Sequence, residues 1–216
     1  MVRAALVLCV FVSSVAIAAP APWTLPPLPA DWKDITEEAM KDPAMEAQRQ
    51  TILKAGGTFE GKMYAGDNGG ILVFTSGFTG ASAVVEELNA FMNGARNSAL
   101  KSSKELEWKV DPTPTMLVGT QRRDQNGQAI TAKMYVGFTD GDDLRAVSFI
   151  CYGEDAVCAP LLAKVTVDTA GLQQLSELDA NKKKLTPRRI GWLVGGLATG
   201  IFILAALWKR RPRVPK

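Results

Sequence analysis

The sequence predicts an α+β domain, with an antiparallel sheet of about five to six strands covered by helices, followed by one C-terminal transmembrane helix. A run of 19 residues without charge, 190–208, is long enough to cross the hydrocarbon layer of a bilayer. Short alternating apolar segments separated by turn residues predict sequential hairpins, whose strands pair antiparallel. One long segment, 82–100, has the apolar spacing of an amphipathic helix.

The amino terminus has the three-part pattern of a secretory signal peptide, residues 1–18. Arg3 supplies the positive start, 4–12 is apolar, and small residues at Ala16 and Ala18 predict cleavage after Ala18. An uncleaved anchor is the alternative, and both interpretations place the middle of the chain outside the cytoplasm. Residues 19–33 form a Pro-rich lead, with five prolines between 19 and 30, for which we expect a polyproline II or disordered tether.

The folded domain is expected to span 34–181 and to begin with two helices. Asp34-x-x-Glu37 resembles a capping box, and Asp42-Pro43 offers a second helix start. The second helix is expected to run to about Ala55 and to end at Gly56-Gly57. Its apolar face is thin, so we expect this helix to lie over the surface of the domain; that face consists of Met45, Ile52 and Leu53.

The sheet begins with a hairpin made of 58–65 and 71–75, joined by a turn at 66–70. The amphipathic helix 82–100 follows, and its apolar stripe predicts a core-facing side. Four further strands are predicted at 105–110, 115–122, 128–138 and 144–151. The turns between them are Asp111 to Pro114, Asn126-Gly127 and Asp140 to Asp143.

Cys151 and Cys158 are the two cysteines that remain after signal removal, and in an oxidising compartment they predict a disulfide. Their spacing is wider than the C-x-x-C of redox-active pairs, although thiol chemistry and free thiols remain alternatives. The bridge is expected to pin the following segment to the sheet edge. Segment 160–167 is ambiguous between strand and helix, and a last helix ending near Asn181 would carry Leu172, Leu175 and Leu178.

Composition excludes several classes of function. All 22 acidic residues lie between Asp31 and Asp179, where there are only 14 Lys and Arg, so this span has a net charge of −8. Such a domain lacks the basic face that nucleic-acid binding requires. The chain has no histidine, which removes His-based triads and His zinc sites. We predict no catalytic, cofactor or metal site.

Two sequence patterns resemble binding motifs, but neither predicts a site. Gly56-x4-Gly61-Lys62 imitates a phosphate-binding loop, but the next residue is Met63 instead of Ser or Thr. Asp140, Asp142 and Asp143 could bind calcium weakly, although a solvated hairpin turn explains them better.

The carboxyl terminus predicts a single membrane span at 190–208, between a juxtamembrane linker at 182–189 and a cytoplasmic tail at 209–216. Five Lys or Arg residues stand on each side, so charge alone does not orient the span, and the amino-terminal signal decides the orientation. We therefore expect an inner-membrane protein with its domain on the periplasmic or extracellular side. The basic flanks can attract anionic lipid, and they include Lys182, Lys183, Lys184, Arg188, Arg189, Lys209, Arg210 and Arg211.

The predicted span also contains two small-x3-small spacings, which allow close packing of membrane helices. They consist of Gly191, Gly195, Gly196 and Gly200. A homodimer through this helix is therefore a possible assembly, beside the contact of the span with the lipid bilayer.

The order of elements over 58–165 is hairpin, long amphipathic helix, four antiparallel strands and a further segment. This order is similar to that of PsbP-like α+β domains, in which helices cover an antiparallel sheet. The resemblance implies a fold used for many binding roles, and it supplies no active-site residues.

The leading functional hypothesis is a non-enzymatic, membrane-anchored extracytoplasmic domain that binds or scaffolds an unidentified protein of the bacterial cell envelope. One alternative is an envelope enzyme that uses carboxylates or Lys in a cleft that the sequence does not reveal. Another is a secreted domain whose C-terminal helix and basic tail are a processed sorting signal.

Overall fold

The computed structural model describes residues 22–81, 83–103, 105–125 and 128–180. Its helices are α1 (Thr36–Met40), α2 (Pro43–Lys54), α3 (Val85–Ser102), α4 (Asp155–Ala163) and α5 (Leu175–Ala180). Its strands are β1 (Trp23–Thr24), β2 (Lys33–Asp34), β3 (Gly57–Gly66), β4 (Gly69–Phe78), β5 (Leu106–Pro112), β6 (Leu117–Gln125), β7 (Gln128–Phe138), β8 (Leu144–Gly153) and β9 (Thr166–Val167).

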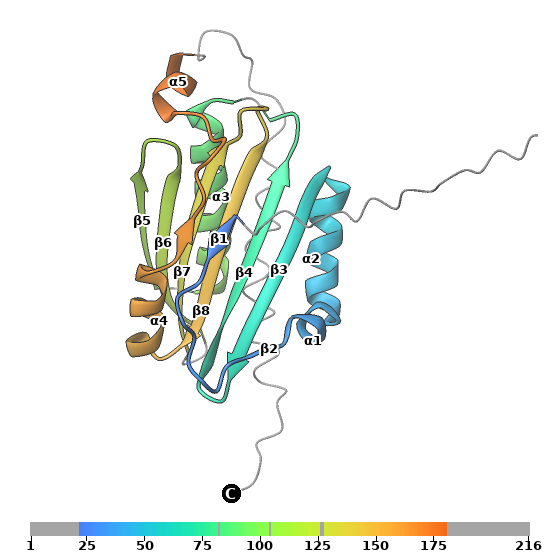
Figure 1. Ribbon diagram of the computed structural model, residues 1–216, viewed down its shortest axis with the longest axis vertical. Coiled ribbons are helices and arrows are strands. Elements are labelled where there is room, and N and C mark those ends of the chain that lie inside the picture. Colours follow the sequence, from blue (N-terminus) through green and yellow to red (C-terminus); the bar gives the residue numbers. More distant parts are fainter. Residues whose placement is uncertain (1–21, 82, 104, 126–127, 181–216) are drawn as a thin grey trace, which may run out of the picture.

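These elements form the predicted α+β fold, arranged in three layers (Figure 1). The middle layer is a seven-stranded antiparallel sheet with the order β2-β3-β4-β8-β7-β6-β5. Helices α1, α2 and α3 cover one face, which we call the helix-covered face, and α4 and the N-terminal lead cover the other, which we call the second face. The sheet has one strand more than expected because Lys33–Asp34, at the end of the lead, adds β2 beside β3.

The strand order follows from two hairpin units joined by α3. The β3–β4 hairpin closes with Gly66 opposite Gly69, as the turn residues predicted. Helix α3 then carries the chain to the far edge, and β5 to β8 return as an antiparallel meander until β8 pairs with β4. Strands β4 and β8 therefore lie in the middle of the sheet and are buried on both faces.

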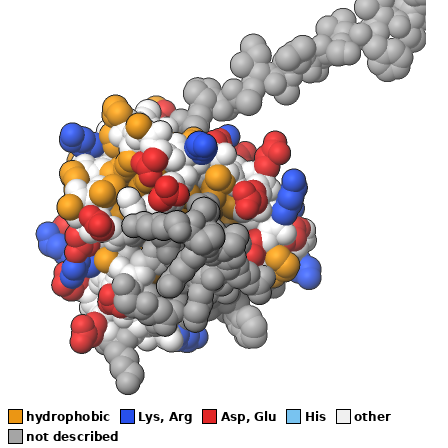
Figure 2. All heavy atoms as spheres, turned by 90° about the horizontal axis from the view of Figure 1, so that it is seen from below, with side chains coloured by type: hydrophobic (Ala, Val, Ile, Leu, Met, Phe, Trp, Pro, Cys, Tyr) orange, Lys and Arg blue, Asp and Glu red, His pale blue; other side chains and the backbone are white. Residues whose placement is uncertain are grey.

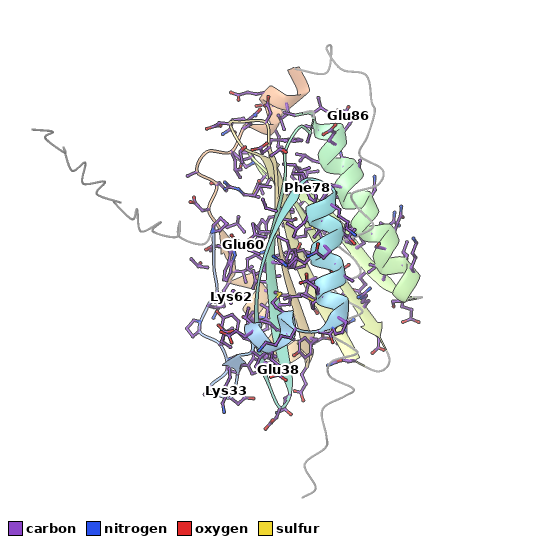
Figure 3. The ribbon with its side chains drawn as sticks, turned by 90° about the vertical axis from the view of Figure 1, so that its right-hand side faces the viewer. Lys33, Glu38, Glu60, Lys62, Phe78 and Glu86 are labelled. Carbon is purple, nitrogen blue, oxygen red and sulfur yellow. A yellow bond between two sulfur atoms is a disulfide. The ribbon has the colours of Figure 1, made fainter. Side chains whose placement is uncertain are left out.

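Alternation of side chains along the strands separates two cores. Phe78 of β4 lies between the sheet and the helices, whereas Glu60 and Lys62 of β3 point to the opposite side (Figure 3). The core under the helices includes Phe74 of β4 and Leu88 of α3, both at most 2% exposed. Burial of such large apolar side chains supplies the main driving force for folding.

Helix α2 corrects one expectation from the sequence. It was expected to lie over the surface, but Met45 and Ile52 are 1% and 2% exposed and belong to the helix-covered core. Only Leu53 of the three apolar residues remains exposed, at 38%. Two inward-pointing apolar side chains are enough to bury one side of this helix. Gln48 lies between them in the sequence and on the same buried side.

The Pro-rich lead corrects another expectation. From Pro22 onward it is ordered, and it runs along the second face with Trp23, Leu25 and Leu28 packed against the core there. β1 pairs antiparallel with β9, with Trp23 opposite Val167, so the lead is joined to the C-terminal part of the domain. Prolines tolerate this position because the lead forms only two ladder residues and needs few backbone donors.

The C-terminal strap, residues 165–180, closes the described structure. The ambiguous segment 160–167 is helix through Ala163 and then strand β9, and α5 begins only at Leu175. None of the helices in the described part of the chain is long and apolar enough to cross a membrane. The predicted signal peptide 1–18, linker 182–189, span 190–208 and tail 209–216 all lie outside the described residues.

Candidate functional site

The predicted disulfide joins Cys151 of β8 to Cys158 of α4, with the two Cα atoms 5.6 Å apart. Both cysteines are buried, at 0% and 1% exposure, in the core of the second face. The expectation that the bridge would hold the following segment to the sheet edge is wrong, because β8 is a central strand. The bridge instead fastens α4 across the middle of the second face, where Leu161 and Leu162 pack beneath it.

A charged cluster ties the beginning of α4 to the edge of the sheet. Arg122 of β6 donates its Nε–H to Asp155 Oδ2 at 3.0 Å, and its terminal nitrogen also binds this oxygen. Glu107 of β5 lies 3.5 Å from the same guanidinium. The hydrogen bonds from Arg122 lower the pKa of Asp155, and the same bonds raise the pKa of Arg122. All three side chains are largely exposed, so the cluster orients α4 more than it stabilises the fold.

Five polar side chains lie buried on the helix-covered side of the sheet, in a core that is otherwise apolar. Their exposures lie between 0% and 6%, and they are Gln48, Ser76, Gln121, Arg123 and Ser148. The Oγ atoms of Ser76 and Ser148 and the Oε1 atom of Gln48 have no hydrogen-bond partner among the described residues. Most buried polar atoms in proteins bind a protein group or an ordered water. These three atoms therefore mark the part of the core with the greatest capacity to bind a further polar group.

Arg123 is the only one of these five that carries a charge. Its Nη1 donates to the carbonyl oxygen of Ala99, in the last turn of α3, at 3.3 Å. Burial lowers the pKa of Arg123 to about 10, so the guanidinium remains protonated at neutral pH. A cation at this end of α3 interacts favourably with the negative end of the helix dipole.

These polar groups can hold a ligand but offer little for proton transfer. A serine hydroxyl becomes a nucleophile only when an adjacent base removes its proton, and the chain has no histidine. In the part of the chain that the structure describes, no group of three or more Cys, Asp or Glu residues is placed to hold a metal ion. Ser76 and Ser148 lie on the adjacent strands β4 and β8, whereas Gln121 and Arg123 lie on β6, beyond β7, so these polar groups offer hydrogen bonding at separate places in the core and do not form one site.

None of these five residues was predicted from the sequence as a binding group. A polar residue at an inward-facing position of an alternating strand could have revealed Gln121 and Arg123. From the sequence alone, such a residue suggests that the inward and outward faces of the strand have been assigned the wrong way round. Gln48 could not be found, because the whole apolar face of α2 seemed too weak to point into the core.

The acidic turn at 140–143, considered for calcium, serves instead to hold the C-terminal strap. Asp142 has a positive φ of 62° and accepts a hydrogen bond from Gln173 Nε2 at 2.6 Å. The same nitrogen donates to the carbonyl oxygen of Thr139 at 2.8 Å, and the backbone N–H of Gln173 donates to Phe138 O at 2.9 Å. We call this set of contacts the Gln173 clasp. The predicted helix-packing glycines and the membrane-flanking basic residues lie outside the described residues.

No protein-family model matches the chain, and no curated protein matches it. Among solved structures, it is similar to one described as LpqN involved in cell envelope biogenesis of Mycobacterium tuberculosis, with 13% identity, a TM-score of 0.39, and coverage of 70% of this chain and 87% of that one. It is also similar to a protein of Bacteroides thetaiotaomicron VPI-5482, with 14% identity, a TM-score of 0.31, and coverage of 70% of this chain and 50% of that one. Neither likeness is close enough to carry an argument about function, and the resemblance to PsbP-like domains stays a prediction.

Proposed function

We propose that this chain is a membrane-anchored extracytoplasmic domain that binds or scaffolds another protein of the bacterial cell envelope. In this proposal residues 1–18 direct export, and the span 190–208 holds the domain at the inner membrane. The folded part described above is the binding module.

The observation that carries the proposal is the disulfide between Cys151 and Cys158. Disulfides form and persist in oxidising compartments such as the bacterial periplasm, and they are rare in the reducing cytoplasm. Both cysteines of the domain are consumed in this one bridge. A buried bridge between a central strand and the helix that covers it is a structural cross-link, which supports an exported domain.

The way the ends of the domain are fastened supports a tethered module. β1, close to the expected signal cleavage point, pairs with β9, which precedes the expected membrane linker. Asp168 in the strap also donates its backbone N–H to Pro22 O at 2.8 Å. The lead and the strap are joined through β1 and β9 on the second face, and the strap then continues to α5, where Leu175 and Leu178 pack into the helix-covered core. Both ends of the domain are therefore fastened to the fold.

Charge limits the kind of partner. The net charge of −8 between Asp31 and Asp179 favours a partner with a positive surface and disfavours nucleic acid. Acidic and basic side chains are interspersed on the end of the molecule seen in Figure 2, so this charge is distributed and does not form one acidic patch there. We therefore expect partner binding that is weakened by salt but not abolished by any single charge reversal.

The first test uses the full chain in cells, with an epitope tag after Lys216. Membrane and soluble fractions are treated with a maleimide that adds mass to free thiols, with and without prior reduction. The proposal expects the protein in the membrane fraction, with thiols that react only after reduction, and a domain that protease removes from spheroplasts. A Cys151→Ala, Cys158→Ala chain is the matched control for labelling. A cytosolic protein that keeps residues 1–18 and whose Cys9, Cys151 and Cys158 all react without reduction would overturn the proposal.

The second test separates the anchored binder from the two alternatives. Mass spectrometry of the mature chain shows whether 190–216 is still attached, and its loss would favour the processed sorting signal. Cross-linking of intact cells, followed by purification in detergent, is expected to recover the same envelope protein in repeated experiments. Hydrolytic or transfer activity of the purified chain, with no recovered protein, would favour the enzyme alternative.

A further inference from the structure

Strand β5 is an open edge of the sheet. It is the last strand in the sheet order, and among the residues that the structure describes only β6 pairs with it. Figure 1 shows β5 at the left margin of the sheet, with no labelled element beyond it. The outer side of such a strand carries backbone N–H and C=O groups without strand partners, so it can accept another strand. At the opposite margin, β2 and α1 adjoin β3, so β5 is the more accessible edge.

The side chains of β5 alternate in character. Leu106, Trp108 and Val110 are half-buried and share the helix-covered face. Glu107, Lys109 and Asp111 share the second face, and their side chains are 76%, 71% and 51% exposed. The exposed row therefore has the charge order minus, plus, minus along the strand.

We propose that β5 pairs antiparallel with β5 of a second copy of this chain, centred on Trp108. A two-fold axis perpendicular to the sheet keeps each face of the first copy continuous with the same face of the second. Glu107 then lies opposite Lys109 of the second copy, and Lys109 lies opposite its Glu107. Leu106 and Val110 lie opposite each other in the same way. Opposite charges and apolar pairs at directly opposed positions both stabilise antiparallel strands.

Other registers fit less well. Centring the pair on Lys109 places Lys109 opposite itself and Glu107 opposite Asp111, so every opposed charge is of like sign. Centring it on Val110 matches Lys109 with Asp111 but brings Pro112, which has no backbone N–H, opposite Trp108. The pairing centred on Trp108 matches residues 106–110 of the two copies and leaves Pro112 outside that ladder, and the like-charged Asp111 and Glu105 are opposed only beyond it.

Lys109 has a second possible role, because an edge lysine discourages unspecific strand addition. In the proposed pair the same lysine selects a partner strand that carries a glutamate opposite it. Lys109 already lies 2.9 Å from Asp111, so in the pair its ammonium group would be flanked by two carboxylates. An edge that repels most strands and accepts its own copy is a device for specificity.

A single pair of strands is a small contact, and this inference rests on the proposed function because it needs the membrane anchor. Two copies held in one membrane meet at a high effective concentration, which makes a weak contact sufficient. Residues 181–189 can span at most about 30 Å when extended, which lets both copies reach the same bilayer from a two-fold pair. The net charge of −8 per domain opposes pairing at low ionic strength, so experiments belong at about 0.15 M salt.

The first experiment traps the pair in cells. A full chain with Glu107→Cys and one tag is co-expressed with a full chain with Lys109→Cys and another tag. The matched control pair is Glu60→Cys with Lys62→Cys, which has the same residue types and spacing on β3 (Figure 3). We expect a disulfide-linked species that contains both tags, severalfold more abundant for 107 with 109 than for 60 with 62. Equal yields of the two pairs would overturn the proposal.

The second experiment exchanges charges on exposed residues outside the core, and the single and double variants lose the contact of Glu107 with Arg122 equally. Glu107→Lys is expected to weaken co-purification of differently tagged copies about tenfold, because both opposed pairs become like-charged. Adding Lys109→Glu in the same chain restores the opposition and should restore co-purification. If the yield of co-purified protein is the same for the natural chain and both variants, the dimer forms through another surface, such as the membrane span, and the β5 pair is overturned. Fractionation of the same cells reports separately whether the protein is membrane-bound, which is the proposed function.

Discussion

Reduction of the Cys151–Cys158 disulfide should destabilise the domain by a predictable amount. The two cysteines are seven residues apart. The chain-entropy relation for a closed loop of this length gives about 2.4 kcal/mol at 25 °C, lost when the bridge is opened. For a domain of this size the melting temperature should fall by about 5–10 °C.

The loss should be concentrated in α4. This helix is held by the bridge, by the apolar contacts of Leu161 and Leu162, and by the exposed bond between Arg122 and Asp155. Without the bridge the apolar contacts, a weak ion pair and the bond from Lys133 Nζ to the carbonyl oxygen of Leu162 at 3.4 Å remain, so α4 should open before the sheet does. Amide hydrogen exchange of 155–163 should therefore accelerate more than that of β4 or β8.

The assay compares oxidised and reduced full-length protein in detergent, with tryptophan fluorescence followed during heating. Mass spectrometry after alkylation verifies the redox state of each sample. A chain with Cys151→Ala and Cys158→Ala is the control, because its melting temperature should not respond to the reductant. An unchanged melting temperature in verified reduced protein, or uniform acceleration of exchange over the whole sheet, would refute the reasoning.

Three further predictions concern single residues. Asp155→Asn should lower the melting temperature at neutral pH, and the difference from the natural chain should vanish in acid. Because Arg122 lowers the pKa of Asp155, the stabilisation is complete above the ordinary pKa of 3.8 and is lost as the pH falls through the lowered pKa. Thermal melts between pH 2 and 7 would check this. Ser148→Ala should leave stability unchanged or raise it by up to about 1 kcal/mol in urea titrations, because it removes a buried hydroxyl that has no hydrogen-bond partner among the described residues. A clear loss of stability would show that this hydroxyl is satisfied in solution. Gly137→Ala should destabilise the domain by about 1–3 kcal/mol in the same titrations, because the added Cβ would lie 2.7 Å from the carbonyl oxygen of Thr115. The control is Gly141→Ala, where the nearest atom to the added Cβ is 3.8 Å away.

Local patterns predicted most of the sheet and its helices. The hairpin of β3 and β4, the long helix α3 and the meander of β5 to β8 all lie within a few residues of their predicted positions. These elements depend on alternation, helical spacing and turn residues, which are properties of short segments. The disulfide was predicted from the two cysteines that remain after removal of the predicted signal peptide, and it is present.

The parts that the sequence did not predict depend on contacts between distant segments. Nothing local in Trp23 and Thr24 indicates a strand, because β1 exists only through its pairing with β9. The pairing of β4 with β8 makes β8 central, and it was this long-range contact that moved the disulfide from the sheet edge to the middle. The buried polar side chains under the helices were missed for the same reason, since the burial of Ser76 on β4 and of Gln121 on β6 depends on how the sheet and the helices pack together.

In the proposed anchored protein, the Gln173 clasp contributes to the response of the domain to a mechanical load. A pull from the proposed span would enter the fold through α5, whose Leu175 and Leu178 pack into the helix-covered core, and would then reach Gln173 before β9. The clasp is attached to the tip of the β7–β8 hairpin, so the tension would be directed along two central strands. Force along a strand loads its ladder bonds together, in shear, whereas a pull at a sheet margin would peel them apart one at a time.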